Sequence, residues 1–254
     1  MSGRVAVVGL GPGDARQLTP EAVQALAAAE ALYGYGPYLA RVPPRAGQMR
    51  HESDNREEGS RAAAALRDAA AGASVALVSG GDPGVFAMAA AVCGAIETGP
   101  VEWRGIDLVV VPGITAMLAV AARVGAPLGH DFCALSLSDN LKPWELIERR
   151  LDAAAGAGFV LALYNPISRA RPWQLGAAFD RLRRQLAAET VVVFGRAVSR
   201  PDESIVVTSL GAADPAVADM ATLVIVGSSE TRVIPRPGRP PLVYTPRSAC
   251  GAGA

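Results

Sequence analysis

The sequence predicts an α/β protein of two domains, with a parallel sheet in the first domain and a mixed sheet in the second. Short runs of valine, leucine and alanine alternate with longer alanine-rich segments along the first half of the chain. Such unbroken apolar runs are typical of parallel strands that helices cover on both faces. In the second half, two predicted strands follow each other with only a short polar link, which favours a hairpin and a mixed sheet.

The first half contains four predicted strands that alternate with helices. Thr19 has the side chain of an N-cap, Pro20 suits the first helical position, and Glu21 complements the positive end of the helix dipole. Three of the strands end in glycine-rich turns, and ligands of open α/β sheets bind beyond the carboxyl ends of the strands. We expect strands at residues 5–8, 31–33, 75–78 and 108–111, and helices at 19–30, 56–71, 85–96 and 115–123.

The second half predicts five strands, two helices and a tail. We expect strands at residues 132–137, 159–163, 191–194, 205–208 and 223–226, with helices at 143–155 and 172–186. The last twenty or so residues are rich in proline, glycine and arginine, which predicts poor order. The predicted domains are therefore residues 1–114 and 115–234, followed by a flexible tail at 235–254.

Composition and charge exclude several classes of protein. The chain has 254 residues, half of them hydrophobic, with 24 basic and 24 acidic side chains. A chain this apolar folds around a core, and a net charge of zero argues against a nucleic-acid surface. The sequence contains no run of 18 or more uncharged apolar residues, so we expect no membrane span. The N-terminus lacks the pattern of an export signal. We expect a soluble, cytoplasmic protein.

The three cysteines, Cys93, Cys133 and Cys250, are far apart and odd in number. None of them has the spacing of a zinc, iron–sulfur or redox motif. We therefore expect unpaired and mostly buried thiols in a reducing compartment, and no metal.

The first glycine turn, which runs from Gly9 to Asp14 and includes Pro12, does not fit the dinucleotide-binding fingerprint. The third glycine of that fingerprint would fall at position 14, and the next helix begins too late to point at a pyrophosphate. By itself the segment reads as a tight turn.

The second and third turns favour a binding site more clearly. Gly80 and Gly81 allow a ligand to approach the backbone closely, and Asp82 either caps the next helix or faces a cationic ligand with ribose hydroxyls. The third turn, residues 112–116, repeats this arrangement at the next strand end, where Thr115 can cap a helix and still present its hydroxyl. Three such turns indicate one composite pocket.

These turns together resemble the tetrapyrrole (corrin/porphyrin) methylases of cobalamin and sirohaem biosynthesis. The residues that carry the resemblance form the motifs GLGPGD at 9–14, GGDP at 80–83 and PGITA at 112–116. Two later segments, LSLSDNLKPW at 135–144 and LYNPISRARP at 163–172, are similar to the precorrin-3B C17-methyltransferase branch of that family. The resemblance extends to about residue 233.

The resemblance implies a fold, a cofactor and its site. Relatives bind S-adenosylmethionine in a folded conformation, in an active-site cleft between two α/β domains, and release S-adenosylhomocysteine. This chain departs from the family pattern at Asn165: several relatives carry methionine at this position, directly after the tyrosine that matches Tyr164. The role of the Asn165 side chain therefore stays open. The family's cofactor positions match Pro12, Gly80, Gly81, Asp82, Val85, Phe86, Thr115, Ala116, Tyr164, Asn165, Ala197 and Thr222.

The expected chemistry is methyl transfer to carbon with contraction of the macrocycle. In-line displacement at a sulfonium needs mainly positioning, whereas the contraction needs a general acid or base. Candidates are Asp14, Ser138 and Asp139, although Asp139 could instead cap a helix and Ser138 could bond its own loop. His130 reads as a surface residue.

The resemblance also implies a polycarboxylate substrate. Arg169 and Arg171 could bind its carboxylates in bidentate pairs, or could simply be solvated. We expect residues 50–56 to form a polar loop, in which His51 could overhang the cleft.

The implied reaction is the methylation of precorrin-3B at C17 with ring contraction to precorrin-4. The alternatives are the same step on cobalt-factor III, methylation at a neighbouring position, and a non-catalytic carrier of a corrin intermediate. The family resemblance further implies a homodimer, with possible transient contacts to neighbouring enzymes of the corrin pathway.

Overall fold

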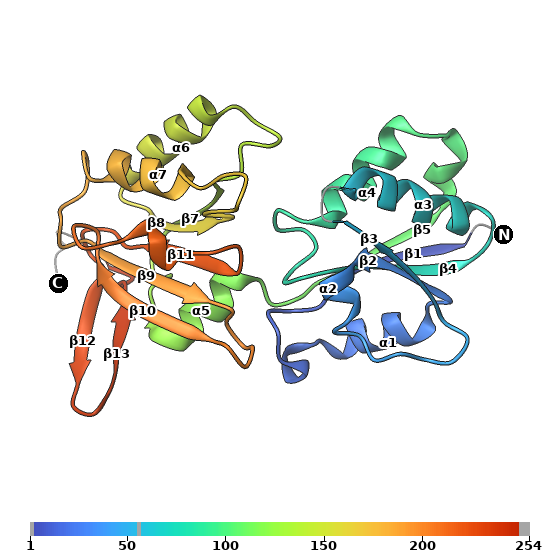
Figure 1. Cartoon of the computed structure of the whole chain (residues 1–254), viewed down its shortest axis with the longest axis horizontal. Coiled ribbons are helices and arrows are strands. Elements are labelled where there is room, and N and C mark those ends of the chain that lie inside the picture. The colour runs from blue at the N-terminus through green and yellow to red at the C-terminus, as the bar shows by residue number, and fades with distance from the viewer. Residues whose placement is uncertain (1–2, 55–56, 249–254) are drawn as a thin grey trace. The chain divides into compact units, whose positions relative to one another are not determined.

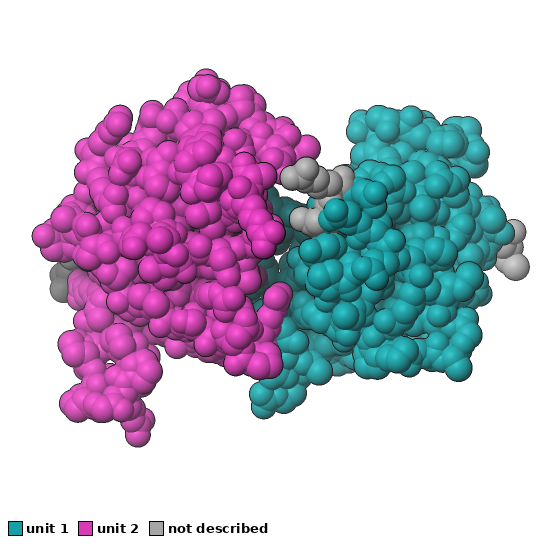
Figure 2. Space-filling model, viewed as in Figure 1, with its two compact units in different colours: residues 1–115 teal, residues 116–254 magenta. Residues whose placement is uncertain are grey.

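The computed structural model describes residues 3–54 and 57–248, which divide into two compact units at Thr115 and Ala116 (Figures 1 and 2). Unit 1 ends at Thr115 and unit 2 begins at Ala116. Cys250, the last residues of the predicted tail and the predicted helix start at residue 56 lie outside the described residues.

Unit 1 is built on a five-stranded sheet in the order β3-β2-β4-β1-β5, and all its pairings are parallel. The predicted parallel sheet is therefore confirmed. Its strands are β1 (Arg4–Gly9), β2 (Ala31–Tyr35), β3 (Met49–Ser53), β4 (Ser74–Ser79) and β5 (Asp107–Val111). Its helices are α1 (Pro20–Ala28), α2 (Gly36–Leu39), α3 (Glu58–Ala70) and α4 (Met88–Thr98), with short 3-10 helices at Ala15–Gln17 and Val101–Gly105.

Side chains of the buried strands point alternately to the two faces of this sheet and pack into a separate apolar core on each face. Val5 and Val7 pack with α3 and α4, whereas Ala6 and Val8 pack with α1 and α2. Thr19 caps α1 by accepting a hydrogen bond from the Ala22 N–H at 3.1 Å, as its side chain predicts.

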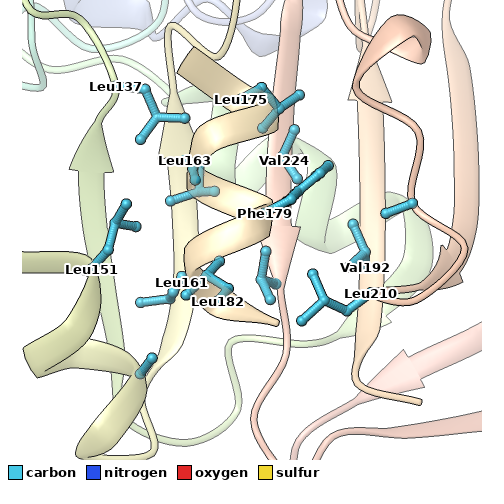
Figure 3. Close-up of a cluster of buried hydrophobic side chains, with 14 of the residues drawn as sticks. Leu137, Leu151, Leu161, Leu163, Leu175, Phe179, Leu182, Val192, Leu210 and Val224 are labelled. Atoms are coloured by element: carbon cyan, nitrogen blue, oxygen red, sulfur yellow. The ribbon is translucent and has the colours of Figure 1, made fainter. Parts of the chain in front are cut away.

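Unit 2 contains a second five-stranded sheet in the order β10-β9-β11-β8-β7. Only β7 and β8 pair in parallel, so this sheet is mixed, as predicted. Leu163, Phe179 and Val224 belong to the apolar core of this unit, which fills the space under α6 and α7 (Figure 3). The strands are β7 (Phe132–Ser136), β8 (Val160–Tyr164), β9 (Val191–Arg196), β10 (Ser204–Ser209) and β11 (Thr222–Val226); the helices are α5 (Ala116–Val124), α6 (Trp144–Gly156) and α7 (Gln174–Leu182), with a 3-10 helix at Pro215–Val217.

The predicted flexible tail is wrong for residues 235–244. β12 (Arg232–Arg236) and β13 (Arg239–Tyr244) form an antiparallel hairpin that projects from its unit (Figure 1). The hairpin is attached through β13, which pairs in parallel with β6 (Gly125–Ala126). Val243 is fully buried, and the Thr245 hydroxyl donates to the Pro127 carbonyl at 2.6 Å. The prediction of poor order from composition failed because these contacts come from residues more than a hundred positions away in the sequence.

Two smaller predictions are also wrong. Residues 50–53 lie in β3 rather than in a loop, because the backbone of β2 provides pairing partners for a segment with no apolar pattern. Cys93 is exposed, since it lies on the outer face of α4, and Cys133 is half-buried; neither is in a disulfide. No helix in the described part of the chain is long and apolar enough to cross a membrane.

Candidate functional site

The first two glycine turns of unit 1 are joined through their backbones. Because β1 and β4 are neighbours in a parallel sheet, the turns that follow them meet at one edge. The Gly11 N–H donates to the Gly81 carbonyl at 3.0 Å, and the Gly81 N–H donates to the Gly11 carbonyl at 2.9 Å. The Leu10 N–H also donates to the Ser79 carbonyl at 2.8 Å. The two turns therefore form one backbone surface.

Asp82 connects the third turn to this surface. One carboxylate oxygen accepts from the Gly84 N–H at 2.8 Å, and the other accepts from the Gly113 N–H at 3.1 Å. Asp82 does not cap the following helix, which begins only at Met88 after an Ala87 N-cap that makes no side-chain hydrogen bond. The helix starts later than predicted because residues 82–87 form this turn instead.

Two of the glycines are required by close approach. A Cβ at Gly113 would lie 2.3 Å from the Gly81 carbonyl oxygen, and a Cβ at Gly80 would lie 2.8 Å from ring carbons of Tyr38. Real Cβ atoms essentially never come within 3.0 Å of another heavy atom in this way. The three turns thus meet because side chains are absent there, which leaves bare peptide groups of the kind that could face a ligand.

Other predicted residues of unit 1 differ in their surroundings. Asp14 accepts from the Arg16 N–H at 2.9 Å and pairs with the Arg16 guanidinium at 2.6 Å, so its carboxylate caps the 3-10 helix beside it. Pro12 is buried between Gly11 and Gly13, whereas Val85 is half-buried in the second turn. Phe86 is 49% exposed, whereas Thr115, directly before α5, is 5% exposed. A catalytic role for Asp14 stays a prediction.

In unit 2, Tyr164 is the last residue of β8, and Asn165 follows it. The Tyr164 hydroxyl accepts from the Met117 N–H at 3.1 Å, in the first turn of α5 that Ala116 begins. The Asn165 side-chain amide donates to the Ser136 hydroxyl at 3.0 Å, at the end of the neighbouring strand β7. These contacts connect α5, β7 and β8 at one end of the sheet.

Ala197 and Thr222 lie together at the ends of β9 and β11. The Ala197 N–H donates to the Ala221 carbonyl at 2.9 Å, and the Thr222 hydroxyl donates to Asp219 at 2.9 Å. Asp219 also accepts from the Arg196 guanidinium at 2.7 Å. Burial alone would raise the pKa of Asp219, but the hydrogen bonds from Thr222, Arg196 and Ala221 outweigh it and hold the pKa below its ordinary value.

Three of the predicted cofactor residues adopt a backbone conformation that side chains disfavour. Among the described non-glycine residues, φ is positive at Phe86 (50°), Asn165 (50°), Ala197 (47°) and Ser199 (67°). Such conformations cost roughly 1–3 kcal/mol and concentrate at functional sites. Asn165 lies in the motif at 163–172 and Phe86 follows the motif at 80–83, whereas Ala197 lies outside the motifs.

Ser138 and Asp139 lie in the loop after β7. Both oxygens of the Asp139 carboxylate accept from the Gln174 side-chain amide at 3.2 Å, and the Ser138 N–H donates to the Ser136 hydroxyl at 3.3 Å. Asp139 does not cap α6, whose N-cap is Pro143. Gln174 is 1% exposed, and the sequence singled it out by no signal beyond its place near a predicted helix start.

Comparison with known proteins shows the family. Residues 4–214 match the family model described as Tetrapyrrole (Corrin/Porphyrin) Methylases. The chain belongs to the tetrapyrrole methylase family. It is similar to a precorrin-3B C(17)-methyltransferase of a Sinorhizobium species, with 66% identity over 252 residues that cover 99% of each chain.

Solved tetrapyrrole methylases have the same fold. A crystal structure of the methyltransferase CobJ is 51% identical, has a TM-score of 0.91, and is matched over 96% of this chain and 100% of that one. A uroporphyrin-III C-methyltransferase of Thermus thermophilus, complexed with S-adenosylhomocysteine, has a TM-score of 0.66 at 23% identity, over 89% of this chain and 97% of that one. The latter shows likeness of fold alone.

The predicted substrate residues of this tetrapyrrole methylase are not equivalent. Arg171 is 9% exposed and donates to the Asn165 carbonyl at 3.5 Å, whereas Arg169 is exposed at the tip of the turn that Ser168 and Arg171 close. His51 is exposed on β3 and stacks on Tyr33, with ring centroids 4.4 Å apart. His130 accepts from the Asp131 N–H at 2.7 Å in its own loop. The described residues contain no group of three His, Cys, Asp or Glu that could hold a metal.

Proposed function

We propose that this protein methylates precorrin-3B at C17 and contracts the macrocycle to precorrin-4 in cobalamin biosynthesis. The observation that carries the proposal is 66% identity to a precorrin-3B C(17)-methyltransferase along essentially both whole chains. The CobJ methyltransferase structure, at a TM-score of 0.91, supports it.

S-adenosylmethionine is the proposed methyl donor. Support comes from membership of a methylase family and from the S-adenosylhomocysteine bound by the Thermus relative. In unit 1 the joined turns offer peptide groups around Gly80, Gly81 and Gly113 to this ligand. In unit 2 we assign Tyr164, Asn165, Ala197 and Thr222 to the same cofactor, because their strained or hydrogen-bonded turns repeat the pattern of the first unit.

The chain's own residues would contribute positioning and proton transfer. Turns fixed by backbone hydrogen bonds can hold the sulfonium carbon about 3–3.5 Å from the nucleophilic carbon. Asp139 is the favoured acid–base group for the contraction, because Gln174 orients its carboxylate. Arg171, together with Arg169, is assigned to substrate carboxylates.

Calorimetry with S-adenosylhomocysteine tests the cofactor. We expect one site per chain, and weaker binding to Asp82→Ala, which loses the link between the second and third turns. Asp107→Ala is the matched control, since this exposed carboxylate lies at the opposite end of β5 beside Arg4. Absence of binding to the wild type at millimolar ligand would contradict the proposal.

Mass spectrometry of the product tests the reaction. We expect precorrin-3B to gain one methyl group and to contract, with cobalt-factor III assayed in parallel. Faster turnover of cobalt-factor III would move the assignment to the cobalt-containing route. A carrier would bind tetrapyrrole without transferring a labelled methyl group.

We further propose that the protein is a cytoplasmic homodimer that contacts neighbouring corrin-pathway enzymes only transiently. Cys93 and Cys133, the two cysteines in the described part of the chain, are not in a disulfide, which suits a reducing compartment. The exposed apolar side chains of Val233 and Ile234 on β12 favour self-association. Sedimentation equilibrium would reveal a dimer mass, and a monomer at all concentrations would contradict the dimer.

A further inference from the structure

Arg41 lies at the point where the first two glycine turns are joined. It follows the short helix α2, and its backbone N–H donates to the Tyr38 carbonyl at 3.1 Å. Its guanidinium donates to the Leu10 carbonyl at 2.5 Å and to the Gly11 carbonyl at 2.9 Å. The same Gly11 carbonyl accepts from the Gly81 N–H. One cation thus bonds to the peptide groups that connect β1 to the turn after β4.

The surroundings make this contact important for the shape of the turns. Leu10 is 4% exposed, and a carbonyl in such a position that loses its donor has little water to replace it. Hydrogen bonds from a charged donor are stronger than those between neutral groups. On the other side of the junction, the Tyr38 ring lies against Gly80. The α2 segment therefore supports both turns, Arg41 through hydrogen bonds and Tyr38 through packing.

We infer that Arg41 is a positioning residue, which holds the turns at Gly11 and Gly81 in the conformation that receives the methyl donor. The inference rests on the proposed function, because it takes these turns as the cofactor site. Arg41 itself need not touch the donor. Its effect passes through the Leu10 and Gly11 carbonyls.

Arg45 provides a matched control within the same loop. Its guanidinium also donates to two backbone carbonyls, those of Ala27 and Ala29, but these lie in the last turn and at the C-cap of α1 rather than in a glycine turn. Replacing either arginine by methionine removes a charged donor and keeps much of the aliphatic volume. Only the Arg41 change removes a contact to the joined turns.

The first measurement is hydrogen exchange in the ligand-free protein. We expect the Gly11 and Gly81 amides to exchange faster in Arg41→Met than in the wild type, with the β1 core amides of Val7 and Val8 unchanged. Arg45→Met should leave the Gly11 and Gly81 amides as they are. A general loss of stability would instead accelerate all four amides together, so this readout separates positioning from stability.

The second measurement is cofactor affinity with steady-state kinetics. Arg41→Met should weaken S-adenosylhomocysteine binding about 10- to 100-fold, as expected for loss of charged hydrogen bonds. Arg41→Lys should fall between it and the wild type, because lysine keeps the positive charge but replaces the planar guanidinium, whose Nη2 donates to both carbonyls, by an ammonium on a flexible stem. The KM for S-adenosylmethionine should rise, while the KM for the tetrapyrrole stays unchanged.

The outcomes distinguish this inference from the proposed function. Wild-type affinity and unchanged Gly11 and Gly81 exchange in Arg41→Met would overturn the role of Arg41. If the wild type itself binds no S-adenosylhomocysteine while these amides still exchange faster in the variant, the cofactor assignment fails and the junction role stands. Should Arg41→Met not fold, Arg41→Lys carries both measurements.

Discussion

At the scale of single residues, the burial of Arg171 separates it from Arg169. Arg171 as a whole residue is 9% exposed, so its side chain has lost much of its hydration, and no ion pair to Arg171 is present among the residues that the structure describes. A buried cation in this state favours an incoming carboxylate. Exposed Arg169 can attract the same substrate only through solvent that contains salt.

We therefore expect the two alanine variants to respond differently to ionic strength. Arg171→Ala should raise the tetrapyrrole KM about 10-fold or more at low and high salt alike, because a desolvated pair is poorly screened. Arg169→Ala should raise it only a few-fold at low salt, and the effect should vanish near 1 M salt. Steady-state kinetics at both salt concentrations measure this. Equal salt dependence of the two variants would contradict the distinction.

Asp219 predicts a pH dependence of stability near the Thr222 turn. Its folded-state pKa lies below the ordinary 3.8, so the carboxylate stabilises the fold above that pH, and the stabilisation is lost as the pH falls through the lowered pKa. Asp219→Asn should therefore lower the urea midpoint at about pH 7. The difference should shrink towards zero as the pH falls below about 4 and then through the lowered pKa of Asp219. A difference that persists in acid would show that the ionised form is not responsible.

The sequence identified the turns of the site but not the contacts that hold them. The motif around Asp82 was visible, yet its bond to Gly113 joins residues 31 positions apart. Gln174 meets Asp139 across 35 positions, with no local pattern to mark it. The positive φ at Ala197 was equally hidden, because alanine gives no signal of a left-handed turn. Local chemistry was therefore predictable, whereas contacts made by folding were not.

At the scale of elements, the β12–β13 hairpin contains its own control. Val243 and Val233 are register partners on the two strands, but Val243 is fully buried and Val233 is 41% exposed. Val243→Ala should lower the free energy of unfolding by about 2 kcal/mol, since it removes buried methyl groups and leaves a cavity. Val233→Ala should change it by less than about 0.5 kcal/mol.

Urea denaturation of both variants measures these values. Equal and small effects would show that the hairpin contributes little to the stability of its unit, as the sequence alone suggested. Equal and large effects would mean that Val233 is covered in solution, which a dimer through β12 would explain.

The same hairpin shows which elements the sequence could not predict. Apart from β3, the strands of the two five-stranded sheets were visible, because burial leaves apolar runs in them. β3 and β12 have mostly exposed side chains, and β12 contains proline, so no alternation or apolar run identifies them. Such strands exist because a neighbour offers backbone pairing, and that neighbour is distant in sequence or itself unpredicted.

At the scale of the whole molecule, the two units have separate apolar cores, so each can report on ligand binding by itself. A ligand stabilises each unit that contributes contacts to it. The free energy of unfolding rises by about 2.7 kcal/mol when the ligand concentration is a hundred times its Kd. Amide exchange in the central strands measures this stabilisation separately in each unit, with Val7 in β1 and Val193 in β9 as reporters.

If the cofactor residues are correctly assigned in both units, saturating S-adenosylhomocysteine should slow the exchange of Val7 and Val193 together, by up to about 100-fold. The Asp82→Ala variant, at the same ligand concentration, should show a smaller gain at both reporters because its affinity is lower. Protection of Val7 alone would instead confine the cofactor to the glycine turns of unit 1. In that case Tyr164, Asn165, Ala197 and Thr222 would stabilise the fold of unit 2 or bind the tetrapyrrole. One of these two roles would then have to account for the strained backbone at Asn165 and Ala197.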